Sequence, residues 1–353
     1  MFEIPEIIDV EALVNTHWHG REGEVVGPLV EMAIAGGADV LGPQPNTENG
    51  LTTATQVVDY IGMAKGLVPR GKTVHFIPFV MITEKTTEKD IDDCVNAGIL
   101  DGKIYPKDRT TKSHNGVEHY GRILPQIKHC GKVGMKVHPH PEHPLMLFSN
   151  HDAEFAFLPI VYMWLEETDA VIVWEHGTDV RCIPHWKYMA KTWKGRFFVT
   201  LTAHHLATNE DSVYGENDAV CKPIIKGESS RQGLVDLVGE DYNWVMAGLD
   251  DAFHPKGAKY PESGRCACGS YTGPLGLPLY AHSLEHLFKT SDGIRTFVNF
   301  TSRNPRKLHK LPPSSRTIKL VRESWKIPPT YPIGHETALP FWAGQMLNYK
   351  IAG

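Results

Sequence analysis

Short apolar runs alternate with longer amphipathic stretches along most of the chain. The apolar runs have the length and composition of buried strands, which predicts strands at Leu13–His17, Asp39–Gly42, Val74–Met81, Gly102–Tyr105, Met135–His138, Ala170–Trp174, Phe197–Leu201 and Trp244–Leu249. Helical spacing of the apolar residues between them predicts helices at Val25–Ala35, Thr53–Lys65, Thr87–Asn96, Val117–Gly131, Ala153–Glu166, Val180–Lys191 and Leu234–Val238. Eight strands that alternate with helices predict the α/β class and a (β/α)8 TIM barrel.

The chain after the eighth predicted strand has a different pattern. Leu275–Phe288 predicts a final helix, and Pro-rich stretches at 311–315 and 327–333 indicate extended chain. No interior stretch has the composition of a linker between domains. We therefore expect one barrel domain over residues 1–353, in which residues 311–353 form an extended C-terminal region that packs on the barrel.

Charge and composition narrow the class of partner. The formal net charge is −5, from 36 basic and 41 acidic residues that are interspersed, so no basic face predicts a nucleic-acid partner. No apolar stretch reaches the roughly 18 residues of a membrane span, and the first residues do not resemble a signal peptide. Six scattered cysteines are typical of reduced thiols. We expect a cytoplasmic protein that acts on a small molecule, with no nucleic-acid or membrane partner.

His17-Trp18-His19 stands at the end of the first predicted strand. Alternate residues of a strand point to the same side, so the two imidazoles project together. Because the sequence has 19 histidines, one such pair is also expected by chance, and its position at a strand end is therefore the stronger signal. Metal sites in barrels are built at strand ends of this kind.

Ionisable residues also follow the other predicted strands. In a barrel the C-terminal ends of the strands converge on one opening. So many ionisable side chains there need partners, and an apolar core does not supply them. A metal would supply those partners, and the predicted ligands are His17, His19, Lys103, His138, His176 and Asp250. Asp250 is also the predicted general base, because a carboxylate at this position can accept a proton from a metal-bound water.

Lys103 needs a chemical change before it can be a ligand, because an ammonium is repelled by a metal cation. Reaction with CO2 gives a carbamate whose two oxygens can bridge two metals. The alternative is that Lys103 pairs with a carboxylate. His138 and His176 have the alternative of being hydrogen-bonded strand-end histidines, and the nearby His140 and His143 make the choice of ligand ambiguous.

Several blocks of sequence occur in a characteristic order. They include His-Trp-His-Gly-Arg21, Gln-Pro-Asn46, Lys103-Ile-Tyr-Pro, Thr200-Leu-Thr-Ala-His-His-Leu206, Cys221-Lys-Pro-Ile, Asp250-Asp-Ala-Phe-His254 and Pro340-Phe-Trp-Ala-Gly344. Through these blocks nearly the whole chain resembles the dihydroorotases of the amidohydrolase superfamily, in particular their single-domain, homodimeric type. The resemblance implies a metal-dependent hydrolase of a cyclic amide C–N bond, which interconverts L-dihydroorotate and N-carbamoyl-L-aspartate in de novo pyrimidine biosynthesis.

The resemblance also implies a role for each matching residue. It implies two Zn²⁺ ions bridged by hydroxide and by N6-carboxylated Lys103. His17, His19 and Asp250 would complete the ligands of one ion, and His138 and His176 would complete those of the other. Asp250 would also carry the proton to the leaving nitrogen. The substrate carboxylate would be held by Arg21, Asn46 and His254, a mobile loop would contain Thr110 and Thr111, and the backbone near Lys222 would contact the ring amide.

The chain departs from its relatives around the same pocket. Asn15-Thr16 stands where they carry an Asp, His138-Pro-His140 replaces His-Gly-Glu, Gln44 replaces a Met, and Asp251 replaces a Ser. None of these changes removes an implied ligand. Two alternatives therefore stay open: a relative that hydrolyses another cyclic amide, imide or lactone, and a non-catalytic barrel that acts as a binding partner.

Overall fold

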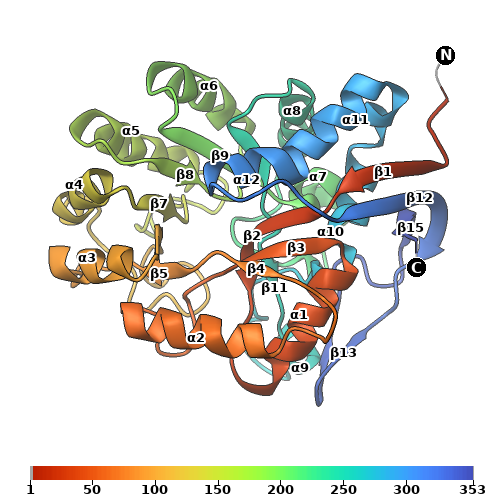
Figure 1. Cartoon of the computed structure of the whole chain (residues 1–353), viewed down its shortest axis with the longest axis horizontal. Coiled ribbons are helices and arrows are strands. Elements are labelled where there is room, and N and C mark those ends of the chain that lie inside the picture. Colours follow the sequence, from red (N-terminus) through yellow and green to blue (C-terminus); the bar gives the residue numbers. More distant parts are fainter. Residues whose placement is uncertain (1–2, 353) are drawn as a thin grey trace.

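Parallel strands form a barrel with helices on its outer surface (Figure 1). The computed structural model describes residues 3–352. The barrel strands are β2 (Leu13–His19), β3 (Ala38–Pro43), β4 (His75–Phe76), β5 (Phe79–Met81), β6 (Asp101–Ile104), β7 (Lys136–Pro139), β8 (Ile172–Trp174), β9 (Phe197–Leu201) and β10 (Val245–Ala247). Paired neighbours among them are parallel, and helices separate most of them along the chain. The predicted α/β barrel is confirmed.

One predicted strand, Val74–Met81, is two strands in the structure. β4 pairs with β3 and β5 pairs with β6, and Ile77 and Pro78 lie between them. Pro78 has no backbone N–H to donate to a ladder, which accounts for the break. A short strand, β11 (Asp251–Ala252), pairs with β2 directly after the chain leaves β10, and so brings residues 250–252 beside the end of β2.

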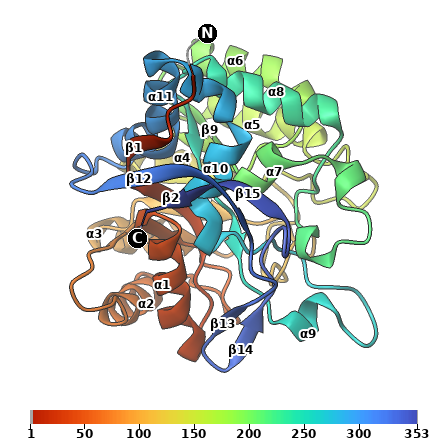
Figure 2. The ribbon, with the colours of Figure 1, turned by 90° about the vertical axis from the view of Figure 1, so that its right-hand side faces the viewer.

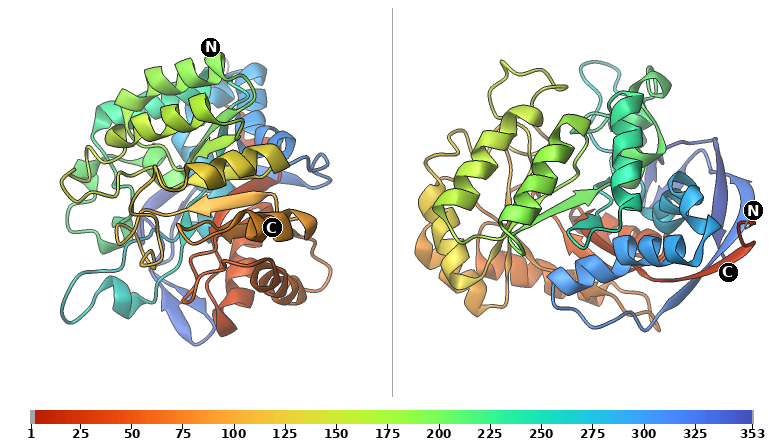
Figure 3. Two further views of the ribbon diagram at one scale, coloured as in Figure 1. Left: turned by 90° about the vertical axis from the view of Figure 1, so that its left-hand side faces the viewer. Right: turned by 90° about the horizontal axis from the view of Figure 1, so that it is seen from above.

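Helices flank the barrel strands or lie in the loops that follow them. They are α1 (Val26–Ala35), α2 (Ala54–Gly66), α3 (Glu88–Asn96), α4 (Leu124–Val133), α5 (Leu158–Glu167), α6 (Ile183–Thr192), α7 (Ala203–Ala207), α8 (Glu228–Gly239), α9 (Lys256–Lys259), α10 (Gly276–Ser283), α11 (Ser291–Val298) and α12 (Asn304–Leu308). The helices from the middle of the chain, drawn in green, lie side by side (Figure 3). Threonine capping boxes begin α2 and α3, where Thr53 and Thr87 accept from the backbone N–H of Gln56 and Asp90.

Helix boundaries differ most from the prediction where the apolar pattern continues beyond the regular helix. The predicted helix Val117–Gly131 begins only at Leu124, and Leu234–Val238 is the end of the longer α8. The predicted helix Leu275–Phe288 is interrupted after Ser283, and a 3₁₀ turn follows at Glu285–Lys289. Burial of apolar residues continues through these turns, so periodicity alone does not locate the breaks.

A small antiparallel sheet joins the first and last parts of the described chain. β12 (Thr317–Lys326) lies between β1 (Ile7–Glu11) and β15 (Met346–Ile351), and β13 (Tyr331–Ile333) and β14 (Glu336–Ala338) form a hairpin. In Figure 2, α10 lies beside β15, against which it packs. These strands were not predicted individually, since the Pro-rich stretches around them dominate the sequence pattern.

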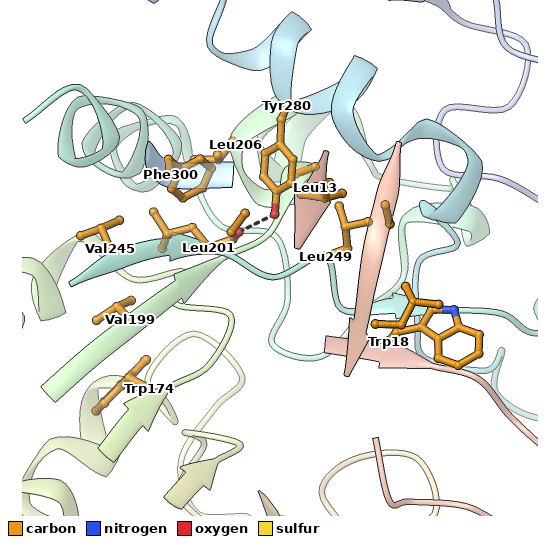
Figure 4. Close-up of a cluster of buried hydrophobic side chains, with 14 of the residues drawn as sticks. Leu13, Trp18, Trp174, Val199, Leu201, Leu206, Val245, Leu249, Tyr280 and Phe300 are labelled. Carbon is orange, nitrogen blue, oxygen red and sulfur yellow. Dashed lines mark hydrogen bonds between the residues drawn. The ribbon is translucent and has the colours of Figure 1, made fainter. Parts of the chain in front are cut away.

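The barrel and the small sheet share one hydrophobic core. Buried residues of β12 and β15, such as Leu320 and Tyr349, belong to the same cluster as Trp18 and Trp174 of the barrel. Within that cluster the Tyr280 hydroxyl donates a 2.7 Å hydrogen bond to the carbonyl of Leu201 (Figure 4). Among residues 3–352, no helix has the length and apolar character that crossing a membrane requires.

Candidate metal centre and substrate pocket

Two imidazoles and one carboxylate converge at the C-terminal end of β2. His17 Nε2 and His19 Nε2 lie 3.2 Å apart. Asp250 Oδ1 lies 3.1 Å from His17 Nε2 and 3.0 Å from His19 Nε2, and all three side chains are buried. Tetrahedral Zn²⁺ with Zn–N bonds of about 2.0–2.1 Å keeps its ligand atoms about 3.3 Å apart. The three atoms thus have the spacing of ligands around one ion.

The protonation states of this cluster favour metal binding. Burial is the largest cause that lowers the pKa of His17 and of His19, so both imidazoles are neutral at neutral pH. Burial opposes ionisation of Asp250, but its hydrogen bonds with His17 and His19 hold the pKa of Asp250 well below its usual value. Neutral imidazole and ionised carboxylate are the forms that coordinate a metal.

Lys103 contacts a carboxylate that the sequence analysis did not include. Lys103 Nζ lies against Glu175 Oε2, which is the alternative that the sequence left open. Glu175 is fully buried and also lies 3.1 Å from His17 Nδ1 and 3.3 Å from His138 Nδ1. Burial lowers the pKa of Lys103 to about 7. Through Glu175, Lys103 lies at the centre of the predicted cluster, between His17 and His138.

His176 lies beside this cluster with both ring nitrogens buried and without hydrogen-bond partners among the described residues. Its ring centroid is 5.2 Å from that of His17 and 4.5 Å from that of His140. The backbone of His176 has a positive φ of 40°, as do Asp250 at 49° and Arg21 at 58°. Such backbone conformations are costly for residues other than glycine and often occur at functional sites.

His138 is oriented differently from the other predicted ligands. Its Nε2 lies 2.9 Å from Asp101 Oδ1, and its Nδ1 faces Glu175. His140 Nε2 lies 2.7 Å from Glu142 Oε2. The structure brings together His17, His19 and Asp250, with Lys103 and His176 around them, whereas the imidazole of His138 is engaged by Asp101 and Glu175.

The predicted substrate-binding residues surround a small cavity next to Asp250. Its volume is about 20 Å³, and its lining includes His19, Asp250, Arg21, Asn46, Thr110, Thr111 and Lys222. His254 lies just outside this lining, with its Nε2 3.1 Å from Arg21 Nη2 and 2.8 Å from the carbonyl oxygen of Cys268. A cavity of this size holds about one water molecule.

The loop after β6 closes this cavity. The Thr111 hydroxyl donates to the Cys268 carbonyl at 3.0 Å, and Asn46 Nδ2 donates to the Thr111 carbonyl at 3.2 Å. On its other side, Asn46 Oδ1 lies 2.9 Å from His19 Nδ1. Asn46 therefore connects the loop directly to the metal-ligand cluster.

No protein-family model matches the chain, whereas individual curated proteins and solved structures do. A curated dihydroorotase of Vibrio vulnificus strain YJ016 is 29% identical over 347 residues, which cover 95% of this chain and 96% of the relative. The structure of dihydroorotase from Saccharomyces cerevisiae in complex with 5-fluoroorotic acid has a TM-score of 0.90 and 24% identity over 99% of both chains. L-Hydantoinase (dihydropyrimidinase) from Arthrobacter aurescens has a TM-score of 0.82 and 12% identity, with 98% of this chain and 83% of that one covered. The chain is similar to curated dihydroorotases over 95% of its length, and its fold is the barrel that the dihydroorotase and L-hydantoinase structures share.

Proposed function

We propose that the protein is a zinc-dependent cyclic amide hydrolase whose substrate is L-dihydroorotate, which it interconverts with N-carbamoyl-L-aspartate in de novo pyrimidine biosynthesis. The observation that carries this proposal is the position of Arg21, Asn46 and His254 beside the cluster of His17, His19 and Asp250. A guanidinium with two neutral partners suits a carboxylate. Burial is the largest cause that lowers the pKa of His254, to about 2, so its imidazole is neutral.

Two Zn²⁺ ions are part of the proposal. His17, His19, Asp250 and N6-carboxylated Lys103 would hold one, and Lys103, His138 and His176 the other. The close spacing of the first three ligands and the unpartnered nitrogens of His176 support this set. When bound, zinc lowers the pKa of water to near neutrality and polarises a carbonyl. Carboxylation would require Lys103 Nζ to leave Glu175, because carbamate and carboxylate are both anions.

The side chains of the chain itself would bind the ring and move the proton. Arg21 pairs with the substrate carboxylate, and Asn46 and His254 hydrogen-bond to it. Asp250 accepts the proton of the attacking water and returns it to the ring nitrogen as the C–N bond breaks. Thr110 and Thr111 close over the ring, while the backbone near Lys222 contacts its amide. Since the cavity of about 20 Å³ is smaller than any such ring, the loop must open before substrate enters.

A second candidate function is the hydrolysis of another cyclic amide or imide. One ground for it is His140, which lies against His176 and replaces the Glu of the His-Gly-Glu sequence typical of dihydroorotases. The other is the structural likeness to L-hydantoinase. A non-catalytic barrel would have no need for a buried imidazole such as that of His176, whose two ring nitrogens have no hydrogen-bond partner among the described residues. We propose catalysis for that reason.

Domain organisation, cellular location and oligomeric state are also part of the proposal. We propose a single domain whose residues 311–353 pack on the barrel, which the shared core supports, and a cytoplasmic location, which fits six unpaired cysteines. A homodimer follows from the resemblance alone. Size-exclusion chromatography with light scattering would measure the oligomeric state.

Hydrolysis of L-dihydroorotate by the zinc-loaded protein, followed by absorbance, tests the proposed function. Dihydrouracil, hydantoin and a simple imide serve as competing substrates. We expect turnover of L-dihydroorotate alone, and its loss after treatment with a chelator. If another ring opens while L-dihydroorotate does not, the second candidate replaces the first. If no ring opens in the zinc-loaded protein, the catalytic proposal is wrong.

A further inference from the structure

A second and larger cavity lies at the opposite end of the barrel from the candidate metal centre. Its volume is about 940 Å³. Its walls include residues at the starts of five neighbouring strands, from Leu100 before β6 to Trp244 before β10, while the metal-ligand cluster lies at the strand ends. Cavities of about 300–1,000 Å³ are typical of small-molecule sites. The proposed function does not use this cavity.

Positive charge dominates the wall of the cavity. Six lysines line it and no aspartate or glutamate does; they are Lys136, Lys187, Lys191, Lys194, Lys307 and Lys310. Two of them have acidic partners. Lys136 Nζ lies 3.2 Å from Asp101 Oδ1, and Lys187 Nζ lies 2.6 Å from Glu240 Oε1. Among the salt bridges of residues 3–352, none involves the other four lysines. In a chain of net charge −5, this is a local concentration of unpaired cations.

Flat apolar groups complete the cavity. Phe198, Tyr242 and Trp244 line it, and the rings of Tyr242 and Trp244 stack with centroids 4.9 Å apart and planes 24° apart. Lys187 Nζ lies over the Tyr242 ring, 5.6 Å from its centroid, so a cation is in contact with this aromatic surface. An aromatic ligand ring would therefore find both a stacking surface and neighbouring positive charge.

A buried polar side chain also lines this cavity. The side chain of His309 is only 2% exposed, and its Nδ1 lies 3.4 Å from Asp101 Oδ1. Its Nε2 has no hydrogen-bond partner in the described part of the chain. A buried polar atom without a hydrogen-bond partner is costly to the fold.

We propose that this cavity is a binding site for a small aromatic polyanion of the mononucleotide class. The lysines would contact the phosphates as point charges, and the base would lie on the surface formed by Phe198, Tyr242 and Trp244. The volume of about 940 Å³ and the aromatic wall favour a small ligand over a nucleic-acid strand, whose backbone needs a long groove. The proposal is independent of the hydrolase activity.

Calorimetric titration of the zinc-loaded protein with ATP tests the site, with tripolyphosphate and adenosine as partial ligands. We expect one ATP per chain with a Kd below about 1 mM, weaker binding of tripolyphosphate and weaker binding of adenosine. Affinity should fall as salt rises. Zinc content is measured after each titration, so that removal of metal by phosphate is recognised.

Charge reversal locates the bound ATP. Lys191 and Lys307 are exposed, so the double variant Lys191→Glu, Lys307→Glu is expected to fold and to lose at least about tenfold in ATP affinity. The matched control is Lys65→Glu, Lys72→Glu, which changes two exposed lysines outside the cavity and alters the net charge equally. Its affinity should change less than about twofold. Arg21→Met should leave ATP binding unchanged, because that residue belongs to the metal-centre pocket.

Three results would overturn the proposal. No heat of binding with ATP at millimolar concentration would remove the site. An equal loss of ATP affinity in the two double variants would show that ATP is held by general charge attraction and not by this cavity. Equal affinity for tripolyphosphate and ATP would contradict the role of the aromatic surface, which Phe198→Ala tests separately through a selective loss of ATP affinity.

Discussion

Glu175 is the residue that organises the interior of the candidate site. Its carboxylate contacts Lys103, His17 and His138, which come from three different strands. In a regular strand Glu175 and His176 would point to opposite sides. β8 ends at Trp174 and His176 has a positive φ, so the alternation stops just before them and both side chains face the cluster. A carboxylate next to a strand-end histidine is the only sequence signal for Glu175, and it is weak.

Lys103→Ala should abolish metal-dependent hydrolysis, because it removes the proposed bridge between the zinc ions. Acetate or propionate added in excess should restore part of the activity if the carbamate is real, since a small carboxylate can occupy the same position. Zinc content by mass spectrometry and initial rates with and without acetate are the measurements. Full activity of the unrescued variant would contradict the bridging role.

Arg21→Met should mainly raise KM for L-dihydroorotate, by roughly tenfold to a hundredfold, because a charge-assisted pair to the substrate carboxylate is lost. Steady-state kinetics measure this change, with the exposed Arg70→Met as the control. An unchanged KM would place the substrate anion elsewhere in the pocket.

At the scale of elements, the loop after β8 is held by a buried ion pair. Lys226 Nζ lies 2.9 Å from Glu154 Oε2, and Glu154 also accepts from the Trp174 indole at 3.2 Å and from the backbone N–H of Thr178 at 2.9 Å. This network connects the start of α8, the turn before α5 and the segment that contains Glu175 and His176. It therefore keeps two site residues in place without contacting the pocket.

Lys226→Met should lower the free energy of unfolding by about 3–5 kcal/mol, because Glu154 would remain as a buried, unpaired charge. The double variant with Glu154→Leu should recover much of that loss, since neither charge then remains. Urea unfolding of the two variants measures the difference. A single variant as stable as the parent chain would contradict a structural role for the pair.

Elements with a continuous apolar pattern were predictable, and those defined by partners far away in the sequence were not. Seven of the eight predicted barrel strands overlap single strands, since their residues are buried on both faces. β1 and β12 depend on pairing between residues 7–11 and 317–321, which no local pattern reveals. The same holds in the site: His-x-His was visible, whereas the contact of His138 with Asp101 depends on the register of β6 and β7.

At the scale of the whole molecule, buried histidines make stability depend on pH. Burial is the largest cause that lowers the pKa of His138 and of His204, each to about 4. The unfolded chain then takes up protons first as pH falls below about 6.5, so stability present at neutral pH is lost progressively towards pH 4. Each such histidine contributes up to about 1.4 kcal/mol per pH unit.

His204→Leu should reduce the slope of the free energy of unfolding against pH by the equivalent of about one proton, because the variant has no imidazole to protonate at this position. The free energy of unfolding of the metal-free protein at several pH values between 7 and 4.5 measures the slope. Identical slopes in the two proteins would contradict the assignment of a low pKa to His204.

The three-stranded sheet has a consequence for the connectivity of the chain. Ile7 of β1 and Lys350 of β15 lie opposite the same residue of β12, Val321. With strands about 4.8 Å apart, these two positions are separated by about 10 Å, a distance that a few residues can span. A circular permutant that joins them by a short Gly-Ser bridge and opens at the exposed Gly71-Lys72 bond is therefore expected to keep the fold. A retained far-ultraviolet circular dichroism spectrum and cooperative unfolding would verify this expectation. An unfolded permutant would show that the barrel depends on the order of its elements along the chain.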